Sequence, residues 1–226
     1  MGPLVAVQAV VFDLDGTLLD RRLSFERFVW NQWERFPLVR DTVDRDQYVR
    51  SAVEHDRDGY APRKDLFANV LAQFGLSIEL SSTLLEDYRE GFPSGCVLFS
   101  DAAQTLATLR AAGLKLGLIT NGSVRMQRAK LRCLSLEHAF DTVLISEAEG
   151  VSKPDPRIFR LALERLRTAP EHSIFVGDHP EVDVSGARGA GMKAVWRRDA
   201  EMSRVVDADA VIESLGDLLQ SLGLHR

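Results

Sequence analysis

The sequence of 226 residues predicts an α/β fold, in which a parallel sheet carries helices on both faces and an all-α domain is inserted after the first strand. Short apolar runs with the length of buried strands recur along the chain. Helical patterns alternate with the later runs, and this alternation is typical of parallel sheets. The stretch 20–93 contains four helical patterns and no convincing strand, which indicates a separate helical domain.

The sheet is predicted from apolar runs at residues 7–12, 114–119, 142–145, 173–176 and 192–196. Ser100 is the predicted N-cap of a helix that follows the insertion, and Gly113 is expected to close that helix. Residues 123–134 form the next predicted helix. Residues 154–167 form another, with prolines in its first turn.

The inserted domain is predicted to be a small helical bundle. A helix at 24–36 places its apolar residues on one stripe, and so does a helix that follows Pro62. The residues of the two stripes are Phe25, Phe28, Val29, Trp33, Phe36, Leu66, Phe67, Val70, Leu71 and Phe74. Helical spacing already explains them, so we favour a bundle core over an aromatic ligand site. The predicted boundaries are 20–93 for this domain, and 1–19 with 94–226 for the core.

Composition and charge restrict the class of partner. The net charge is −5, from 28 basic and 33 acidic residues, which argues against nucleic acid or an anionic membrane as the main partner and favours a small molecule. The two cysteines, Cys96 and Cys133, show no spacing typical of a disulfide framework or a zinc site. The N-terminus lacks a basic signal region, and no apolar run approaches the roughly 18 residues of a membrane span. We therefore expect a cytoplasmic protein.

Acidic residues follow two of the predicted strands. Asp13 and Asp15 come directly after the first strand, and Asp178 ends the run "SIFVGD". In open α/β sheets, ligands bind at the carboxyl ends of the strands. Two carboxylates so close together predict a hard cation such as Mg²⁺, although a D-x-D-G-T string can also be an acidic turn. Asp183 follows nearby, where an aspartate could also cap a helix.

Thr120, Asn121 and Lys153 complete a predicted phosphate site. Thr120 and Asn121 end the second strand, where a hydroxyl and the backbone N–H groups of the following helix can bind phosphoryl oxygens. Lys153 precedes a helix start, where the helix dipole disfavours a cation. It is therefore expected to face an anion, although a solvated surface lysine is the simpler alternative.

The stretches "DLDGTLLD", "LITNGS", "SKPDPRIF" and "VGDHPEVD" resemble, in this order, the four motifs of the haloacid dehalogenase superfamily, in its phosphatase branch. The resemblance covers nearly the whole core, and its specificity comes from the combination and order of the motifs. It implies a Rossmann-like core with a helical cap domain inserted between the first and second motifs. The long stretch between Asp15 and Thr120 agrees with this arrangement.

The resemblance also implies residue roles. Asp13 resembles the nucleophile that forms an aspartyl-phosphate and binds Mg²⁺, and Asp15 resembles the acid/base, whose backbone carbonyl is a further metal ligand. Asp178 matches the remaining metal carboxylate. Asp183 matches an acid that supports the ion or Lys153. Thr120 and Lys153 resemble the residues that bind the phosphoryl group.

The implied function is Mg²⁺-dependent hydrolysis of a small phosphate monoester such as a sugar phosphate or a nucleotide. A phosphomutase of the β-phosphoglucomutase type shares the same motifs and remains an alternative. A dehalogenase normally lacks the second aspartate, so Asp15 argues against that activity. A non-catalytic phosphate-binding module should have lost at least one of Asp13, Asp15, Lys153 or Asp178, and the sequence retains all four.

Substrate selectivity is expected to lie in the cap domain. Its polar stretch 55–63 offers His55, Arg57, Tyr60 and Arg63 as candidate contacts, although a solvated loop is the favoured interpretation. His179 stands where the family commonly has Ser or Thr. Because Mg²⁺ prefers oxygen ligands, we expect His179 to be a solvent-facing or supporting residue rather than a metal ligand.

Overall fold

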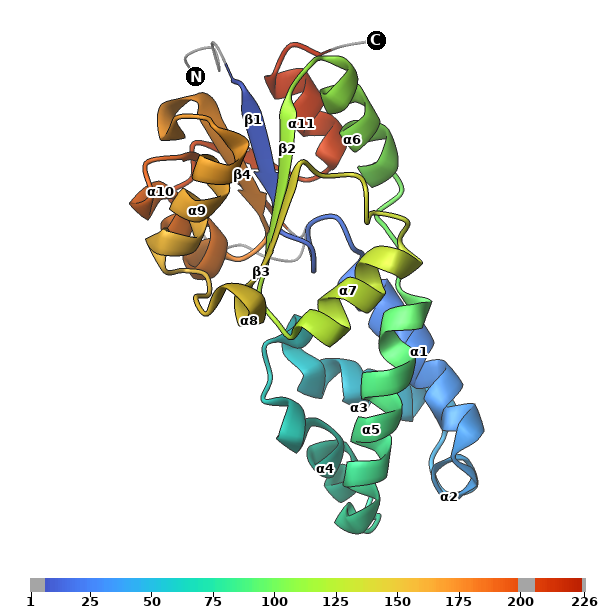
Figure 1. Cartoon of the computed structure of the whole chain (residues 1–226). Coiled ribbons are helices and arrows are strands. Elements are labelled where there is room, and N and C mark those ends of the chain that lie inside the picture. The colour runs from blue at the N-terminus through green and yellow to red at the C-terminus, as the bar shows by residue number, and fades with distance from the viewer. Residues whose placement is uncertain (1–6, 199–205, 225–226) are drawn as a thin grey trace. The chain divides into compact units, whose positions relative to one another are not determined.

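The computed structural model describes residues 7–198 and 206–224, and within them six strands form one parallel sheet (Figure 1). The strands are β1 (Ala9–Phe12), β2 (Lys115–Thr120), β3 (Thr142–Ile145), β4 (Ser173–Gly177), β5 (Lys193–Arg197) and β6 (Ala210–Ile212). Their order is β3-β2-β1-β4-β5-β6, so β1 lies between β2 and β4. The predicted α/β fold with a parallel sheet is confirmed. The sequence interpretation missed β6, which has three residues and an exposed centre at Val211.

Both faces of the sheet are covered, which explains why its central strands are continuous apolar runs. Alternate side chains of a strand point to opposite faces. Val11 and Phe175 pack against α9 (Pro156–Leu166) and α10 (Gly186–Gly189), and Phe175 makes an edge-on contact with Phe159 at a ring distance of 5.0 Å. The opposite face carries α6 (Ala102–Ala111) and α11 (Leu215–Ser221), as Figure 1 shows.

The remaining helices of this unit are α7 (Val124–Cys133) and α8 (Ser146–Glu149), with a short 3-10 helix η4 (Pro170–His172) and a π-helical turn η5 (Pro180–Ser185). The predicted helix start at Ser123 is confirmed, because its Oγ accepts the N–H of Met126. The predicted N-cap at Ser100 is wrong. The helix begins after Asp101, and the Asp101 carboxylate accepts the N–H of Gly216 in α11, so it links the two helices of this face.

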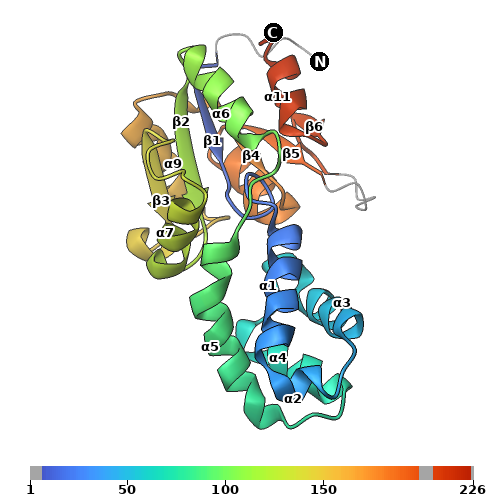
Figure 2. The same cartoon turned by 90° about the vertical axis from the view of Figure 1, so that its right-hand side faces the viewer.

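The described residues form two compact units, one from Asp20–Val97 and the other from the chain on either side of it. The unit Asp20–Val97 is fully described and contains no strand. Its elements are α1 (Arg21–Arg35), α2 (Pro37–Arg40), α3 (Arg45–Asp56), η1 (Arg57–Gly59), α4 (Arg63–Gln73), η2 (Ile78–Leu80), α5 (Ser81–Gly91) and η3 (Phe92–Gly95). Figure 2 shows them as a bundle in which α1 and α5 lie side by side.

Aromatic side chains form the core of this helical unit. Phe25 and Phe28 on α1 contact Tyr88 and Phe92 edge-on, with ring distances between 5.6 and 6.2 Å. The predicted stripe is therefore a packed core over most of its length. Trp33 and Phe36, toward the end of α1, are only half-buried, and the indole N–H of Trp33 donates to the carbonyl of Val43.

Neither Cys96 nor Cys133 forms a disulfide. Among residues 7–198 and 206–224, no helix combines the length and the apolar character that a membrane span requires.

We predict that Phe159→Ala destabilises the sheet-containing unit by about 3–5 kcal/mol, because it removes the contact with Phe175 and leaves a cavity between α9 and β4. Chemical denaturation measures the loss. The exposed neighbour Arg160 on the same helix is the matched control, and Arg160→Ala should stay within about 0.5 kcal/mol of the wild type. A loss below about 1 kcal/mol for Phe159→Ala would contradict this packing.

Candidate active site

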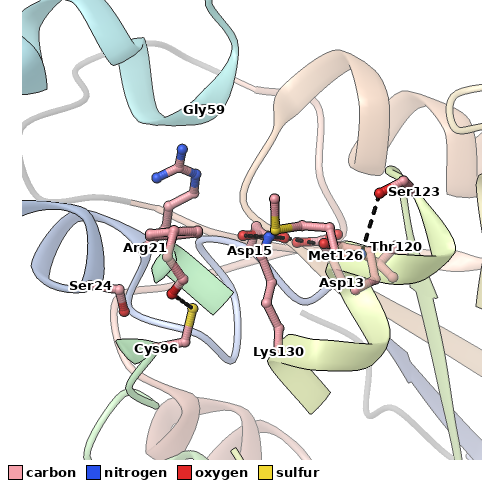
Figure 3. Close-up of polar contacts among 12 residues, drawn as sticks. Asp13, Asp15, Arg21, Ser24, Gly59, Cys96, Thr120, Ser123, Met126 and Lys130 are labelled. Carbon is pink, nitrogen blue, oxygen red and sulfur yellow. Dashed lines mark hydrogen bonds and ion pairs between the residues drawn. The ribbon is translucent and has the colours of Figure 1, made fainter. Parts of the chain in front are cut away.

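The candidate site lies where the parallel strands end, within the sheet-containing unit. Asp13 and Asp15 follow β1, Thr120 is the last residue of β2, and Asp178 follows β4. Since neighbouring parallel strands run in the same direction, these ends meet at one edge of the sheet. Figure 3 shows Asp13, Asp15 and Thr120 at this edge.

Three carboxylates converge there around one lysine. Asp13, Asp178 and Asp183 each offer an oxygen within 4.8 Å of the others. The ammonium of Lys153 lies 2.5 Å from Asp13 Oδ1 and 2.7 Å from Asp183 Oδ1, and Lys153 is only 4% exposed. Lys153 therefore faces anions, as its position before a helix predicted. One ammonium cannot balance three ionised carboxylates, so all three can be ionised together only with a further positive charge beside them.

Asp178 carries an oxygen atom that the rest of the cluster leaves unsatisfied. Its Oδ1 atom is buried and has no hydrogen-bond partner among the described residues. Burial, and then the charges of Asp183 and Asp13, raise the pKa of Asp178 well above its ordinary value. A buried carboxylate oxygen without a partner is costly, and a bound cation would satisfy it.

The backbone around Asp178 leaves room for its carboxylate. A Cβ atom at Gly16 would lie 2.4 Å from Asp178 Oδ2, and Gly16 has φ +84°, which favours glycine. A Cβ at Gly177 would lie 2.4 Å from the Cβ of Asp183. The glycines thus let the carboxylates of Asp178 and Asp183 lie close to the backbone. The donor atoms of the cluster are carboxylate oxygens, which are the ligands that Mg²⁺ prefers.

Burial also changes the protonation of the Asp13–Lys153 pair. Burial, together with the charges of Asp183 and Asp15, raises the pKa of Asp13 to about 7, even though Lys153 lowers it. For Lys153, burial alone would lower the pKa, but Asp13 and Asp183 raise it above its ordinary value. Lys153 therefore stays charged. A cation beside Asp13 would favour its ionised form, which is the form that can act as a nucleophile.

Asn121 positions Lys153 through its side chain. Its amide Nδ2 donates to the Lys153 carbonyl at 2.9 Å, and its Oδ1 accepts the Lys153 N–H at 3.0 Å. Because the side-chain amide of Asn121 is bonded to the backbone of Lys153, the backbone N–H of Asn121 is left to bind phosphate as predicted. Two N–H groups at the following helix start are already bonded, that of Gly122 to Ser146 and that of Val124 to Glu147, so the helix start is less available to phosphate than predicted.

Asp15 lies beside two residues that the sequence interpretation missed. Lys130 on α7 contacts both carboxylate oxygens of Asp15, at 2.7 and 2.8 Å, and Figure 3 shows its side chain extending to Asp15. Gln127 donates to Asp15 Oδ2 at 3.0 Å and also to the Oγ of Thr120. Gln127 and Lys130 are three residues apart and share one face of α7. The sequence does not single out Lys130, because α7 also contains three arginines.

His179 takes the capping role that was considered for Asp183. Its Nδ1 accepts the N–H groups of Glu181 and Val182, both at 3.1 Å, and so caps η5. The Asp183 carboxylate instead accepts the His179 N–H at 3.0 Å and contacts Lys153. The interpretation that Asp183 caps a helix is therefore wrong, because its side chain points toward Lys153 and the other carboxylates. The Nδ1 of His179 is occupied by backbone, in agreement with a supporting role.

The candidate selectivity residues all lie in the helical unit. Arg63 contacts the Asp56 carboxylate and donates to the Gly59 carbonyl at 2.6 Å, so it holds its own loop together. Arg21 donates to the same carboxylate at 3.0 Å. His55 lies 2.8 Å from the carbonyl of Ser51 on the preceding turn.

Among those candidates, Tyr60 is 53% exposed, and Arg57 stands in a left-handed conformation at the end of α3. Their contact with substrate stays a prediction.

Comparison with known proteins places these features in a family. The family model for haloacid dehalogenase-like hydrolases matches residues 7–191. A phosphoserine phosphatase from Thermus thermophilus is 43% identical over 137 residues, a match that covers 59% of this chain and 53% of that protein. The chain thus matches about half the length of the first of its curated relatives.

Solved structures match over nearly the whole chain. A HAD phosphatase from Thermococcus onnurineus is 31% identical, with a TM-score of 0.67 and coverage of 97% of this chain and 100% of that one. The HAD-hydrolase YfnB from Bacillus subtilis, in a crystal structure bound to magnesium, is 25% identical, with a TM-score of 0.76 and coverage of 96% and 98%. The resemblance inferred from the four motifs is confirmed.

We predict that Mg²⁺ raises the melting temperature of the wild-type protein, because an ion that binds only the folded state stabilises it. Asp178→Asn should lose most of this rise, since it removes the negative charge of the carboxylate whose buried oxygen lacks a partner. Thermal melts with EDTA and with millimolar Mg²⁺ measure the difference. Asp141→Asn is the matched control, because Asp141 bonds the backbone of Leu116, and it should keep the full response. A full response in Asp178→Asn would assign the metal to other residues.

Proposed function

Because the chain belongs to the haloacid dehalogenase-like hydrolase family, we propose that it is a Mg²⁺-dependent phosphatase that hydrolyses a small phosphate monoester through an aspartyl-phosphate on Asp13. The observation that carries this proposal is the cluster of Asp13, Asp178 and Asp183 beside the buried Lys153, with one buried Asp178 oxygen unsatisfied. Such a cluster suits a cation together with a phosphate dianion, which is the electrostatic requirement of phosphoryl transfer.

In the first step, a carboxylate oxygen of Asp13 attacks phosphorus, and the bond between phosphorus and the leaving oxygen breaks. Asp13 is held for this role by Lys153 and by its backbone N–H, which donates to the Val176 carbonyl at 2.9 Å. Asp15 donates a proton to the leaving alkoxide.

In the second step, the same Asp15 carboxylate takes a proton from water as the water oxygen attacks phosphorus. The bond from phosphorus to Asp13 breaks, and phosphate leaves. Asp15 is only partly buried, with 22% of its side chain exposed, so exchange of its proton with water is possible.

Thr120 and Lys153 are proposed to bind the phosphoryl oxygens. The Thr120 hydroxyl accepts a hydrogen bond from Gln127, so its own proton is available to donate to phosphate. Lys153 supplies a charge that remains positive, as its raised pKa indicates. Asp13, Asp178 and the backbone carbonyl of Asp15 would hold Mg²⁺, which when bound supplies charge neutralisation for the phosphoryl group.

The substrate is proposed to be a small phosphorylated metabolite. The relative from Thermus thermophilus is a phosphoserine phosphatase, and the match covers about half of it, so phosphoserine is one candidate among small monoesters. A phosphomutase would instead return the phosphoryl group to a second hydroxyl of a sugar. Release of inorganic phosphate from a panel of metabolites separates the two reactions and ranks the substrates.

We predict that the wild-type protein hydrolyses p-nitrophenyl phosphate with Mg²⁺ and loses this activity in EDTA. Asp13→Asn should lower kcat by about 10³-fold or more, because it removes the nucleophile. Rapid quenching and borohydride reduction during wild-type turnover should convert residue 13 to homoserine, detected by mass spectrometry. Substantial turnover by Asp13→Asn, verified free of deamidation to aspartate, would exclude Asp13 as the nucleophile.

We predict that selectivity depends on the helical unit. Exchange of residues 20–93 for those of a relative with another preference should change the ranking of kcat/KM among monoesters, because the sheet-containing unit supplies only the phosphoryl chemistry. The requirement for Mg²⁺ should stay the same, since all proposed ligands remain. An unchanged ranking in a folded, active chimaera would place recognition in the sheet-containing unit.

A further inference from the structure

Asp15 is held by its own pair of side chains, separate from the cluster around Lys153. Both of its carboxylate oxygens lie within 2.8 Å of the Lys130 ammonium, and Gln127 donates to Oδ2 at 3.0 Å. Lys130 is 5% exposed and Gln127 is 1% exposed. Figure 3 shows the Lys130 side chain extending to Asp15. Lys130 belongs to α7, whereas Lys153 precedes α9 in the sequence.

This arrangement is costly unless it has a function. Burial of an ammonium group and an amide carries a desolvation penalty that an apolar side chain of similar size would avoid. The Asp15 carboxylate offsets the penalty by accepting charge-assisted hydrogen bonds at short distances, and such bonds fix orientation as well as adding energy. The carboxylate that must transfer protons is thus restricted in its rotation.

Gln127 connects the proton-transfer group to the phosphate-binding group. Its Nε2 donates both to Asp15 Oδ2 and to the Oγ of Thr120. The carboxylate of Asp15 and the hydroxyl of Thr120 are therefore held a fixed distance apart through one amide. This geometry would set where the acid/base stands relative to a phosphoryl group bound at Thr120.

We propose that Lys130 is the positioning residue for the acid/base Asp15, and that Gln127 fixes the distance between the Asp15 carboxylate and the Thr120 hydroxyl. The proposal rests on the phosphatase function proposed above. Lys130 acts through Asp15, because it contacts both oxygens of that carboxylate. Its removal should affect the steps that need proton transfer and should leave attack by Asp13 intact.

The choice of leaving group distinguishes steps that need proton transfer by Asp15 from attack by Asp13, which does not. An alkoxide needs a proton from Asp15 as it departs, whereas p-nitrophenolate is stable at neutral pH and departs without one. Hydrolysis of the aspartyl-phosphate needs Asp15 as a base for either substrate. Loss of positioning should therefore slow transfer from an alkyl phosphate, spare transfer from p-nitrophenyl phosphate, and slow the second step for both.

The experiment compares Lys130→Met with the wild type on p-nitrophenyl phosphate and on phosphoserine or the best alkyl phosphate from the substrate panel. For p-nitrophenyl phosphate, kcat should fall about 10- to 100-fold with kcat/KM within about threefold, and a burst of one p-nitrophenolate per enzyme should precede the slow steady state. For the alkyl phosphate, kcat/KM should fall at least about tenfold. Lys130→Arg should restore most of the activity, because it keeps a cation opposite Asp15.

Lys115→Met is the matched control, since the Lys115 ammonium bonds the carbonyls of Leu166 and Arg167 at the end of α9. It should keep both kcat values within about twofold, because its bonds serve only stability. Thermal melts check that each variant is folded. If Lys130→Met does not fold, Lys130→Gln takes its place, since it keeps an N–H donor and removes the charge.

Wild-type kcat on both substrates in a folded Lys130 variant would overturn the proposal. An equal fall of kcat/KM on both substrates, without a burst, would also overturn it, because it would show general damage to the site. Absence of Mg²⁺-dependent activity in the wild-type protein would instead refute the phosphatase function itself, so the two failures are distinguishable.

Discussion

The close approach of three carboxyl groups at the carboxyl edge of the central strands is the constraint on which the site depends. Asp13, Asp178 and Asp183 converge there, and the ammonium of Lys153 contacts Asp13 and Asp183. A parallel sheet brings the ends of β1 and β4 together because the strands are neighbours in register. The fold thus brings several carboxyl groups close together, and the surrounding side chains orient them. A bound cation would offset their mutual repulsion.

Much of the nearby structure serves this arrangement. Gly16 and Gly177 leave room for the Asp178 and Asp183 carboxylates, where a Cβ atom would collide with them. Asn121 holds the backbone of Lys153 by two hydrogen bonds. His179 caps η5 and donates its N–H to Asp183, so the turn after β4 keeps that carboxylate facing Lys153. These contacts orient charged groups that would otherwise repel one another.

The two aspartates of the first motif have different surroundings although only one residue separates them. Asp13 is buried and faces Lys153, whereas Asp15 is partly exposed and faces Lys130 and Gln127. Different environments allow two carboxylates to take different roles in one reaction. In the proposed mechanism, this difference separates the nucleophile from the acid/base, and each has its own lysine.

The sequence by itself determined the parallel α/β sheet, five of its six strands and the residues that follow them, since apolar runs and strand-end carboxylates are local patterns. The sequence did not predict the short strand β6, because three residues with an exposed centre form no recognisable apolar run.

Only the tertiary structure decided the partners of those residues. Lys130 is one of several basic residues on α7 and lies far along the chain from Asp15, so no spacing predicts their contact. Ser100 and Asp183 were plausible helix caps by residue type, but Asp101 bonds α11 and Asp183 faces Lys153. Side-chain partners depend on which elements pack together, and that packing is a property of the whole fold rather than of any local stretch.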